Sequence, residues 1–427
     1  MPQKITPERV PELLRPGMTV FVQGASGEPR PLLDALAAAP EASAGVHYAG
    51  CFIPGVNTID PASFHPGARL TSFFVFGDIA RSHAAGRVRF LPLHYSGIWD
   101  YLARLEVDLA LLQVAPPDRH GRCSLGVSVH FVPAVLQRAK VIVAEVNAAM
   151  PRPAHSYELA YDRLDYAVGT ERPLVALATG APAPEIDRIG RNVARLIKDG
   201  DTLQIGIGKV PAAVLGSLRD LRDLGLHGGL ISDEVAELHA AGVLNGARKS
   251  YEPKTMVCTA ALGSEAVYRW AGRCPDLRFA PVSHTHDVRV IAQIDRFVAI
   301  NSVLSVDLCG QANAETVGGR QVSGTGGLLD FVRGARLSKG GRSILALPST
   351  ADGRTSRIVP RLGESDVVSC PRADADIVVT EHGIAHLRDK SVDERAEALI
   401  AIADPGFRDA LTEHWESIRR RKDGPRR

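Results

Sequence analysis

Short apolar runs alternate with helix-like stretches along this chain, and small residues separate the two. Near the N-terminus, residues 18–22 form an apolar run that is typical of a buried strand. A turn of small residues follows at 24–27, and apolar residues at helical spacing come next, at Leu32, Leu33 and Leu36. This order of strand, turn and helix predicts βαβ units built on a parallel sheet.

The same pattern returns in the second half of the chain. Apolar positions between 186 and 197 predict one buried helical face, and residues 202–205 predict a strand. A glycine turn at 206–208 then leads into another helix. Gly17 before the first strand matches Gly200 before the second, an offset of 183 residues. An offset of this length predicts a duplicated α/β domain and not a short solenoid repeat.

A weaker correspondence links two apolar runs, 107–114 and 376–381, each of which leads to a His-Gly pair. Such runs are typical of strands that are buried on both faces of a parallel sheet. A proline-rich stretch at 179–184 is the predicted boundary between domain 1–181 and domain 186–427. We therefore expect an α/β protein of two related open domains, with an active-site cleft between them.

Composition narrows the class of protein. Apolar residues make up 45% of the chain and charged residues 23%, which is typical of a globular fold. The net charge of +2 gives no electrostatic reason to expect nucleic acid as a partner. No run of about 18 apolar residues occurs, so no membrane span is expected. The six cysteines form no CxxC pair and the N-terminus lacks an apolar signal segment, which favours a cytoplasmic protein with reduced thiols.

Three glycine-rich segments are candidates for binding an anion. Residues 206–210 lead from a predicted strand through a GxG turn into a helix, whose first N–H groups lack partners. Residues 318–327 include five glycines, and such a loop can direct several N–H groups at one oxygen. Lys339 precedes a third glycine pair. Tight turns are the alternative interpretation of all three.

Histidines suggest a metal site only weakly. Glu381, His382 and His386 lie close in sequence, but the zinc-protease pattern needs glutamate directly after the first histidine. His284 and His286 have an alternating spacing that fits ordinary polar or packing roles equally well. We expect no bound metal.

The C-terminal half carries a block of motifs that resembles a known family. The block includes NSVLSVDLCGQANAE at 301–315, the glycine loop with DF at 330–331, RGA at 333–335, SKGG at 338–341, ALPST at 346–350 and TEHGIA at 380–385. It is similar to the acetyl-CoA hydrolase/transferase family, the class I CoA-transferases of the 4-hydroxybutyrate type. The resemblance continues to residues 203–211 and to 118–126, and so covers most of the chain.

The resemblance implies a fold of two related open α/β domains and a carboxylate nucleophile. In that family a glutamate attacks an acyl-CoA thioester, becomes a glutamyl-CoA thioester, and is released by a carboxylate acceptor such as acetate. CoA is then a substrate, no cofactor is permanently bound, and a homodimer or larger homo-oligomer is expected. By the resemblance, Gly326 and Gly327 stabilise the oxyanion, and CoA contacts Gly206, Ile207, Gly208, Lys209, Val210, Ser323, Gly327 and Lys339.

One departure from the family concerns the nucleophile itself. The family segment resembles GIHTEMISDG, whereas this chain has GLHGGLISDE at 225–234, which puts Gly229 at the glutamate position. Two other carboxylates are candidates. Glu234 lies near the start of a helix capped by Ser232, and Glu28 follows the first glycine turn, from where it could face the cleft. For both, the alternative is a helix-start carboxylate.

Three functions are consistent with these residues. The preferred one is a CoA-transferase that acts on a small acyl-CoA and a carboxylate, with its nucleophile displaced from position 229. An acyl-CoA hydrolase would let water attack in place of the glutamate. A non-catalytic acyl-CoA-binding protein would keep the ligand loops without chemistry. Glu315 and Glu381 lie within matched motifs, and we expect them to orient loops.

Overall fold

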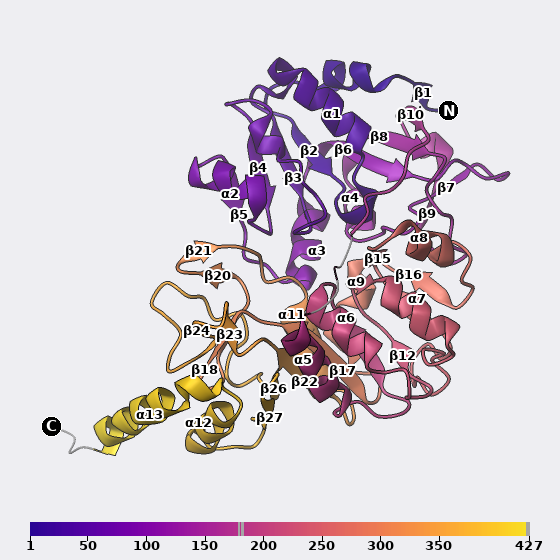
Figure 1. Ribbon diagram of the computed structural model, residues 1–427. Helices are drawn as coiled ribbons and strands as arrows, with labels where there is room; N and C mark the ends of the chain where they lie inside the picture. Colours follow the sequence, from indigo (N-terminus) through magenta and orange to yellow (C-terminus); the bar gives the residue numbers. More distant parts are fainter. Residues whose placement is uncertain (178–179, 181–182, 424–427) are drawn as a thin grey trace.

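The computed structural model describes residues 1–177, Gly180 and residues 183–423, and it contains two α/β units (Figure 1). The strands of one large sheet lie between residues 3 and 170, and those of the other lie between 202 and 386. Of the predicted boundary at 179–184, Thr179, Ala181 and Pro182 lie outside the described residues, so the exact domain limits remain a prediction.

The first sheet has eight parallel strands in the order β1-β10-β8-β6-β2-β3-β4-β5. Central strand β6 is buried at nearly every position because its side chains are apolar on both faces. The strands are β1 (Gln3–Lys4), β2 (Thr19–Val22), β3 (His47–Gly50), β4 (Arg69–Ser72), β5 (Val88–Phe90), β6 (Val107–Val114), β8 (Ala139–Asn147) and β10 (Tyr166–Thr170). Its helices are α1 (Arg30–Ala38), α2 (Gly77–Ala84), α3 (Tyr95–Arg104) and α4 (Val132–Val135).

The second sheet has six strands in the order β12-β11-β17-β22-β26-β27, and only β27 is antiparallel. Phe297 and Ala299 of β17 pack with α11, whereas Val298 and Ile300 belong to the core that α5 and α6 cover, as the period of two requires. The strands are β11 (Thr202–Ile205), β12 (Gly225–Leu226), β17 (Phe297–Ser302), β22 (Arg342–Ala346), β26 (Ile377–Thr380) and β27 (Gly383–His386).

Helices cover both faces of this second sheet. Its helices are α5 (Pro184–Ala194), α6 (Lys209–Gly216), α7 (Asp233–Ala240), α8 (Glu265–Ala271), α9 (Val282–Thr285), α10 (Val288–Ile291), α11 (Leu328–Leu337), α12 (Val392–Ala401) and α13 (Arg408–Asp423). Short paired strands lie outside the two sheets: β7 (Arg122–Ser124), β9 (Glu158–Ala160), β13 (Leu230–Ile231), β14 (Met256–Cys258), β15 (Ala260–Ala261), β16 (Leu277–Phe279), β18 (Ser305–Asp307), β19 (Ala312–Asn313), β20 (Thr316–Val317), β21 (Arg320–Gln321), β23 (Thr350–Ala351), β24 (Thr355–Ser356) and β25 (Ile358–Val359). No helix among the described residues is both long enough and apolar enough to cross a bilayer.

Strand order confirms the main internal repeat and corrects the weaker one. Strand β2 lies between β3 and β6, and β11 lies between β12 and β17, so the two strands have equivalent places. The predicted second correspondence, 107–114 with 376–381, is wrong. Strand β6 pairs directly with β2, whereas β17 and β22 separate β26 from β11. Strands β6 and β26 are both buried on two faces, and their sequences are both apolar for this reason. They nevertheless occupy different positions in their sheets.

Candidate active site

The loop at 318–327 lies across the interface between the two α/β units. Its Ser323 carbonyl accepts a hydrogen bond from the Val75 N–H (3.1 Å), and its Gly326 carbonyl accepts one from the Tyr95 N–H (3.1 Å). At Gly324 there is no room for a side chain, because a Cβ would lie 2.1 Å from the carbonyl oxygen of Phe73. Residues from both units therefore fix the position of this loop.

Two N–H groups of this loop are available to a ligand. Within the part of the chain that the structure describes, the backbone N–H groups of Gly326 and Gly327 donate to no protein acceptor. Gly327 is also the N-cap of α11, so the positive end of the helix dipole lies at the same place. This arrangement suits an oxygen that becomes negatively charged.

Residues 206–210 form the start of α6, as the sequence predicts. Strand β11 ends at Ile205, and Gly208 has φ of 111°, a conformation that favours glycine. The side chain of Ile207 packs against a buried cluster that includes Ala25 and Val56 of the first unit, and Lys209 is exposed. The helix start thus faces the same interface as the loop at 318–327.

Lys339 lies away from the loop at 318–327 and from the start of α6. It follows the C-terminal end of α11, where its carbonyl accepts from the N–H of Arg296, just before β17. Gly327 lies at the opposite end of this ten-residue helix, about 15 Å away along its axis. A ligand that touches both Gly327 and Lys339 would therefore have to span this length.

Gly229 faces a histidine that the sequence did not single out for catalysis. The Gly229 carbonyl accepts from the N–H groups of Thr259 and Ala260, which fix its backbone. A Cβ at Gly229 would lie 3.2 Å from Cε1 and 3.3 Å from Nε2 of His286. A Cβ at Gly327 would lie 2.6 Å from the same Nε2. The imidazole therefore lies between the family's nucleophile position and the glycine loop.

Aromatic side chains hold the His286 ring in place. Its centroid is 4.8 Å from the Tyr95 ring and 4.5 Å from the Phe331 ring. The residue is only 2% exposed, and burial together with nearby His130 and His227 places its pKa well below the usual value. His286 is therefore neutral at physiological pH.

Glu28 is a buried carboxyl group on the first unit's side of the interface. It is 1% exposed, and its Oε2 accepts from Nδ2 of Asn57 at 2.9 Å. Its Oε1 has no hydrogen-bond partner among the described residues. Asn57 itself lines a cavity of about 500 Å³ together with Phe76 and Ile79. In contrast to Glu28, both carboxylate oxygens of the buried Glu145 accept hydrogen bonds from the guanidinium of Arg172.

Stability should depend on pH through Glu28. Burial raises its pKa from 4.5 to about 7, although the Asn57 hydrogen bond opposes the change. A raised carboxyl pKa stabilises the folded state fully below pH 4.5, and this stability is lost as pH rises through about 7. Relative to Glu28→Gln, the free energy of unfolding should fall by about 3 kcal/mol over this range. Urea unfolding of both proteins at several pH values measures the free energy of unfolding. A difference between wild type and Glu28→Gln that does not change with pH would contradict the prediction.

The other predicted carboxylates are held by local hydrogen bonds. The Ser232 hydroxyl donates to Oε2 of Glu234 at 2.5 Å, in the first turn of α7. Glu315 accepts from Ser369 and from Thr325 of the glycine loop. Glu381 accepts from the N–H and the hydroxyl of Ser349. Glu315 and Glu381 thus hold loops, as predicted.

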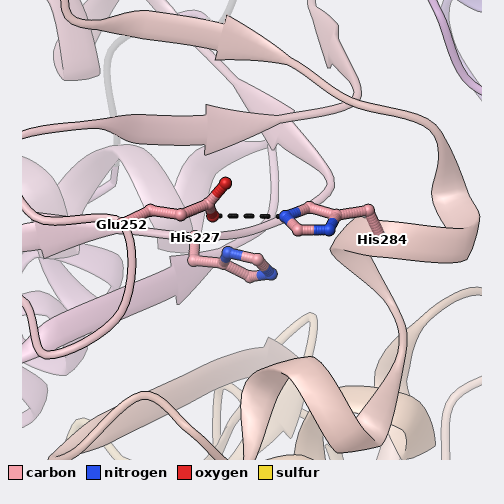
Figure 2. A group of neighbouring side chains, drawn as sticks. All are labelled: His227, Glu252 and His284. Carbon is pink, nitrogen blue, oxygen red and sulfur yellow. Dashed lines mark hydrogen bonds and ion pairs between the residues drawn. The ribbon is translucent and has the colours of Figure 1, made fainter.

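A cluster of His227, Glu252 and His284 has the residue types of a metal site (Figure 2). Nε2 of His284 lies 3.2 Å from Oε2 of Glu252, the interaction drawn dashed in Figure 2. However, Arg278 forms an ion pair with the other oxygen of Glu252, and Lys249 adds a second positive charge nearby. These cations already balance the carboxylate, so the cluster is explained as an ion-pair network.

The remaining histidines considered for metal binding have other contacts. His382 lies 3.8 Å from Glu381 and 3.6 Å from Asp404, at distances of loose ion pairs. His286 points into the interface and not toward His284's carboxylate partner. The expectation of no bound metal remains a prediction.

One further contact at the interface could not be predicted from the sequence. Asp330 of α11 accepts from both the N–H and the hydroxyl of Ser96 in α3, at 3.1 and 2.6 Å. This pair fastens the start of α11, and with it Gly327, to the first unit. Its members are 234 positions apart, and the DF motif at 330–331 gives no sign that its aspartate contacts Ser96.

Comparisons with known proteins agree with this architecture. The N-terminal and C-terminal domain models of the acetyl-CoA hydrolase/transferases match residues 2–178 and 263–415. A 4-hydroxybutyrate coenzyme A transferase of Clostridium kluyveri is 37% identical, over 96% of this chain and 97% of that protein. The crystal structure of RipA from Yersinia pestis superimposes with a TM-score of 0.91 at 32% identity, covering 98% of each chain.

A hydrolase relative is more distant. An acetyl-CoA hydrolase of Neurospora crassa is 25% identical, over 78% of this chain and 71% of that protein. The predicted enzyme class, a CoA-transferase, therefore has the stronger support, and the predicted fold of two related α/β domains is confirmed. The chain belongs to the acetyl-CoA hydrolase/transferase family.

Proposed function

We propose that this protein transfers CoA from a small acyl-CoA to a carboxylate such as acetate, and that Glu28 is the attacking carboxylate. The 37% identical transferase supports the class of reaction. Glu28 is proposed for the missing nucleophile because Gly229 has no side chain and Glu234 is engaged by Ser232.

The observation that carries the proposal is the unpaired Oε1 of buried Glu28. A buried carboxyl oxygen without a partner is costly unless a ligand or water completes its hydrogen bonds. A raised pKa also makes the ionised carboxylate more basic, and so a better nucleophile than an exposed one. Asn57, which donates to Oε2 of Glu28, also lines a cavity of about 500 Å³, so we propose that a movement of Asn57 admits a small acyl or carboxylate group to Glu28.

The reaction then proceeds by four acyl substitutions. The Glu28 carboxylate attacks the thioester carbonyl, the C–S bond breaks, and the thiolate of CoA leaves an acyl–Glu28 anhydride. The thiolate attacks the Glu28 carbonyl, which releases the first carboxylate and leaves a Glu28–CoA thioester. The acceptor carboxylate attacks the Glu28 carbonyl of this thioester, the C–S bond breaks, and an acceptor–Glu28 anhydride forms. The returning thiolate then attacks the acceptor's carbonyl, which forms the new acyl-CoA and releases Glu28 as the carboxylate. Each tetrahedral oxygen is stabilised by the N–H groups of Gly326 and Gly327.

The contacts with CoA follow from the same arrangement. We place its pantetheine near residues 206–210 and Ser323, whose positions face the interface, and its nucleotide end toward Lys339. The protein is proposed to work in the cytoplasm as a homo-oligomer, and it needs no permanently bound cofactor in this reaction.

Trapping the covalent intermediate tests the proposal. The protein is incubated with acetyl-CoA or butyryl-CoA, treated with borohydride, and digested for mass spectrometry. We expect a CoA adduct, or its reduced product, on Glu28. Glu28→Gln should abolish both adduct and transfer, whereas the matched variant Glu234→Gln should keep both.

Other outcomes decide between the alternatives. Acceptor-dependent transfer by Glu28→Gln would remove Glu28 from the mechanism. CoA release that does not depend on the acceptor would replace the transferase with a hydrolase. Tight binding of acyl-CoA without any turnover would leave a non-catalytic binding protein.

A further inference from the structure

We propose that His286 supplies a third hydrogen-bond donor, its Nε2–H, to the oxygen that the N–H groups of Gly326 and Gly327 stabilise. The inference rests on the proposed function, since it names a further catalytic residue for that thioester reaction. It follows from the position of the ring, from its tautomer and from its charge.

The position of Nε2 is fixed by its two glycine neighbours. This atom would lie 2.6 Å from a Cβ at Gly327 and 3.3 Å from a Cβ at Gly229, so a side chain at Gly327 would displace the ring and one at Gly229 would crowd it. Within the described residues, Nε2 has no protein hydrogen-bond partner. The available N–H groups of Gly326 and Gly327 lie on the same loop segment. A substrate oxygen at this segment can therefore meet donors from the loop and from the ring.

The tautomer follows from the hydrogen bonds of Thr285. Its hydroxyl lies 2.8 Å from Nδ1 of His286 and 3.4 Å from the Pro281 carbonyl. That carbonyl already accepts from the N–H groups of His284 (2.9 Å) and Thr285 (3.1 Å). The contact with Nδ1 is the shorter one, at 2.8 Å against 3.4 Å, and the carbonyl already has two N–H donors, so we assign the Thr285 hydroxyl proton to Nδ1. The ring proton of the neutral imidazole is then on Nε2.

The neutral state of His286 suits this role. A buried neutral imidazole can donate to an oxyanion without leaving an unpaired positive charge in the ground state. The rings of Tyr95 and Phe331 restrict its orientation, so the donor does not have to be reoriented during the reaction. The same tautomer leaves no lone pair on Nε2, which excludes His286 as the base that would activate water.

Nitrogen NMR tests the tautomer without requiring turnover. The protein carries 14 histidines, and His286→Gln identifies the signals of the ring in a sample with ¹⁵N-labelled histidine. We expect a protonated Nε2 and an unprotonated Nδ1, and the Nε2–H signal should shift when acetonyl-CoA, a ketone analogue of acetyl-CoA, is added. A protonated Nδ1, a cationic ring or an Nε2 signal unchanged at saturation would overturn the proposal.

Kinetics of paired variants test the catalytic role. His286→Met keeps a side chain of similar size but removes the donor, so kcat should fall about 100-fold while KM for acyl-CoA changes less than about threefold. His286→Gln places an amide N–H near the Nε2 position and should keep kcat within about tenfold. Equal losses in both variants, or a loss confined to KM, would overturn the proposal. If the wild type transfers no CoA at all, the proposed function fails, and the NMR experiment still decides the role of His286.

Discussion

Replacing Gly324 with alanine is expected to lower kcat for CoA transfer on the order of a thousandfold. The added Cβ would lie 2.1 Å from the Phe73 carbonyl oxygen and 3.1 Å from the Phe74 ring. Neither neighbour can yield easily, because the first is backbone and the second is buried. The loop must therefore move away from the first unit, and Gly326 and Gly327 move with it. A displacement of about 1 Å costs about 100-fold, and two donors are displaced together.

Val322→Ala is the matched control for this loop. The Val322 side chain is 37% exposed and its backbone N–H donates to the Glu315 carbonyl, so its side chain can be shortened without moving the loop. Steady-state kinetics and thermal unfolding of both variants measure the effect. The kcat of Gly324→Ala should fall much further than any decrease in the fraction of folded enzyme, as measured by thermal unfolding, can explain. An active Gly324→Ala enzyme with an unchanged melting temperature would show that the loop position does not matter for the reaction.

The sequence determines the individual elements of this fold well, because their signals are local. Strand β11 was predicted at its observed limits, since Gly200 and the turn at Gly206 bound a short run of buried residues. The helix at Leu32, Leu33 and Leu36 is present for a similar reason, because helical spacing places these three side chains on one buried face. Strand order is not local, and the mistaken equivalence of 107–114 with 376–381 shows the difference.

The candidate site is less predictable, because its contacts join distant positions. Gly229 and His286 are 57 residues apart, and the meaning of each depends on the other: the missing side chain at 229 provides the space that the ring occupies. Glu28 could be proposed from its place after a glycine turn, but its unpaired oxygen depends on how Asn57 approaches it. Lys339 is the opposite case: a lysine beside glycines gives no sign of which edge of the sheet it occupies, and the structure places it at the far end of α11 from Gly327.

A carboxylate introduced at position 229 should become a nucleophile once His286 makes room for it. In the wild type, a Cβ at this position would lie within 3.2–3.3 Å of the imidazole, tighter than ordinary packing, so Gly229→Glu alone should form little adduct. His286→Asn shortens the opposing side chain and keeps a polar group. In a Glu28→Gln background, the pair Gly229→Glu with His286→Asn should restore acceptor-dependent CoA transfer at least about 100-fold above the Glu28→Gln level.

Mass spectrometry locates the restored chemistry. The CoA adduct should appear at position 229 and should be absent from the controls, Glu28→Gln alone and Glu28→Gln with His286→Asn. The comparison with Glu28→Gln/Gly229→Glu isolates the contribution of the imidazole, because only the side chain at 286 differs. Equal adduct formation with and without His286 would mean that the ring does not obstruct a side chain at 229. No adduct in the triple variant, with CoA binding retained, would mean that position 229 does not face the thioester in this protein. In that case, the closeness of His286 to position 229 would not explain why this chain has glycine where the family has its glutamate.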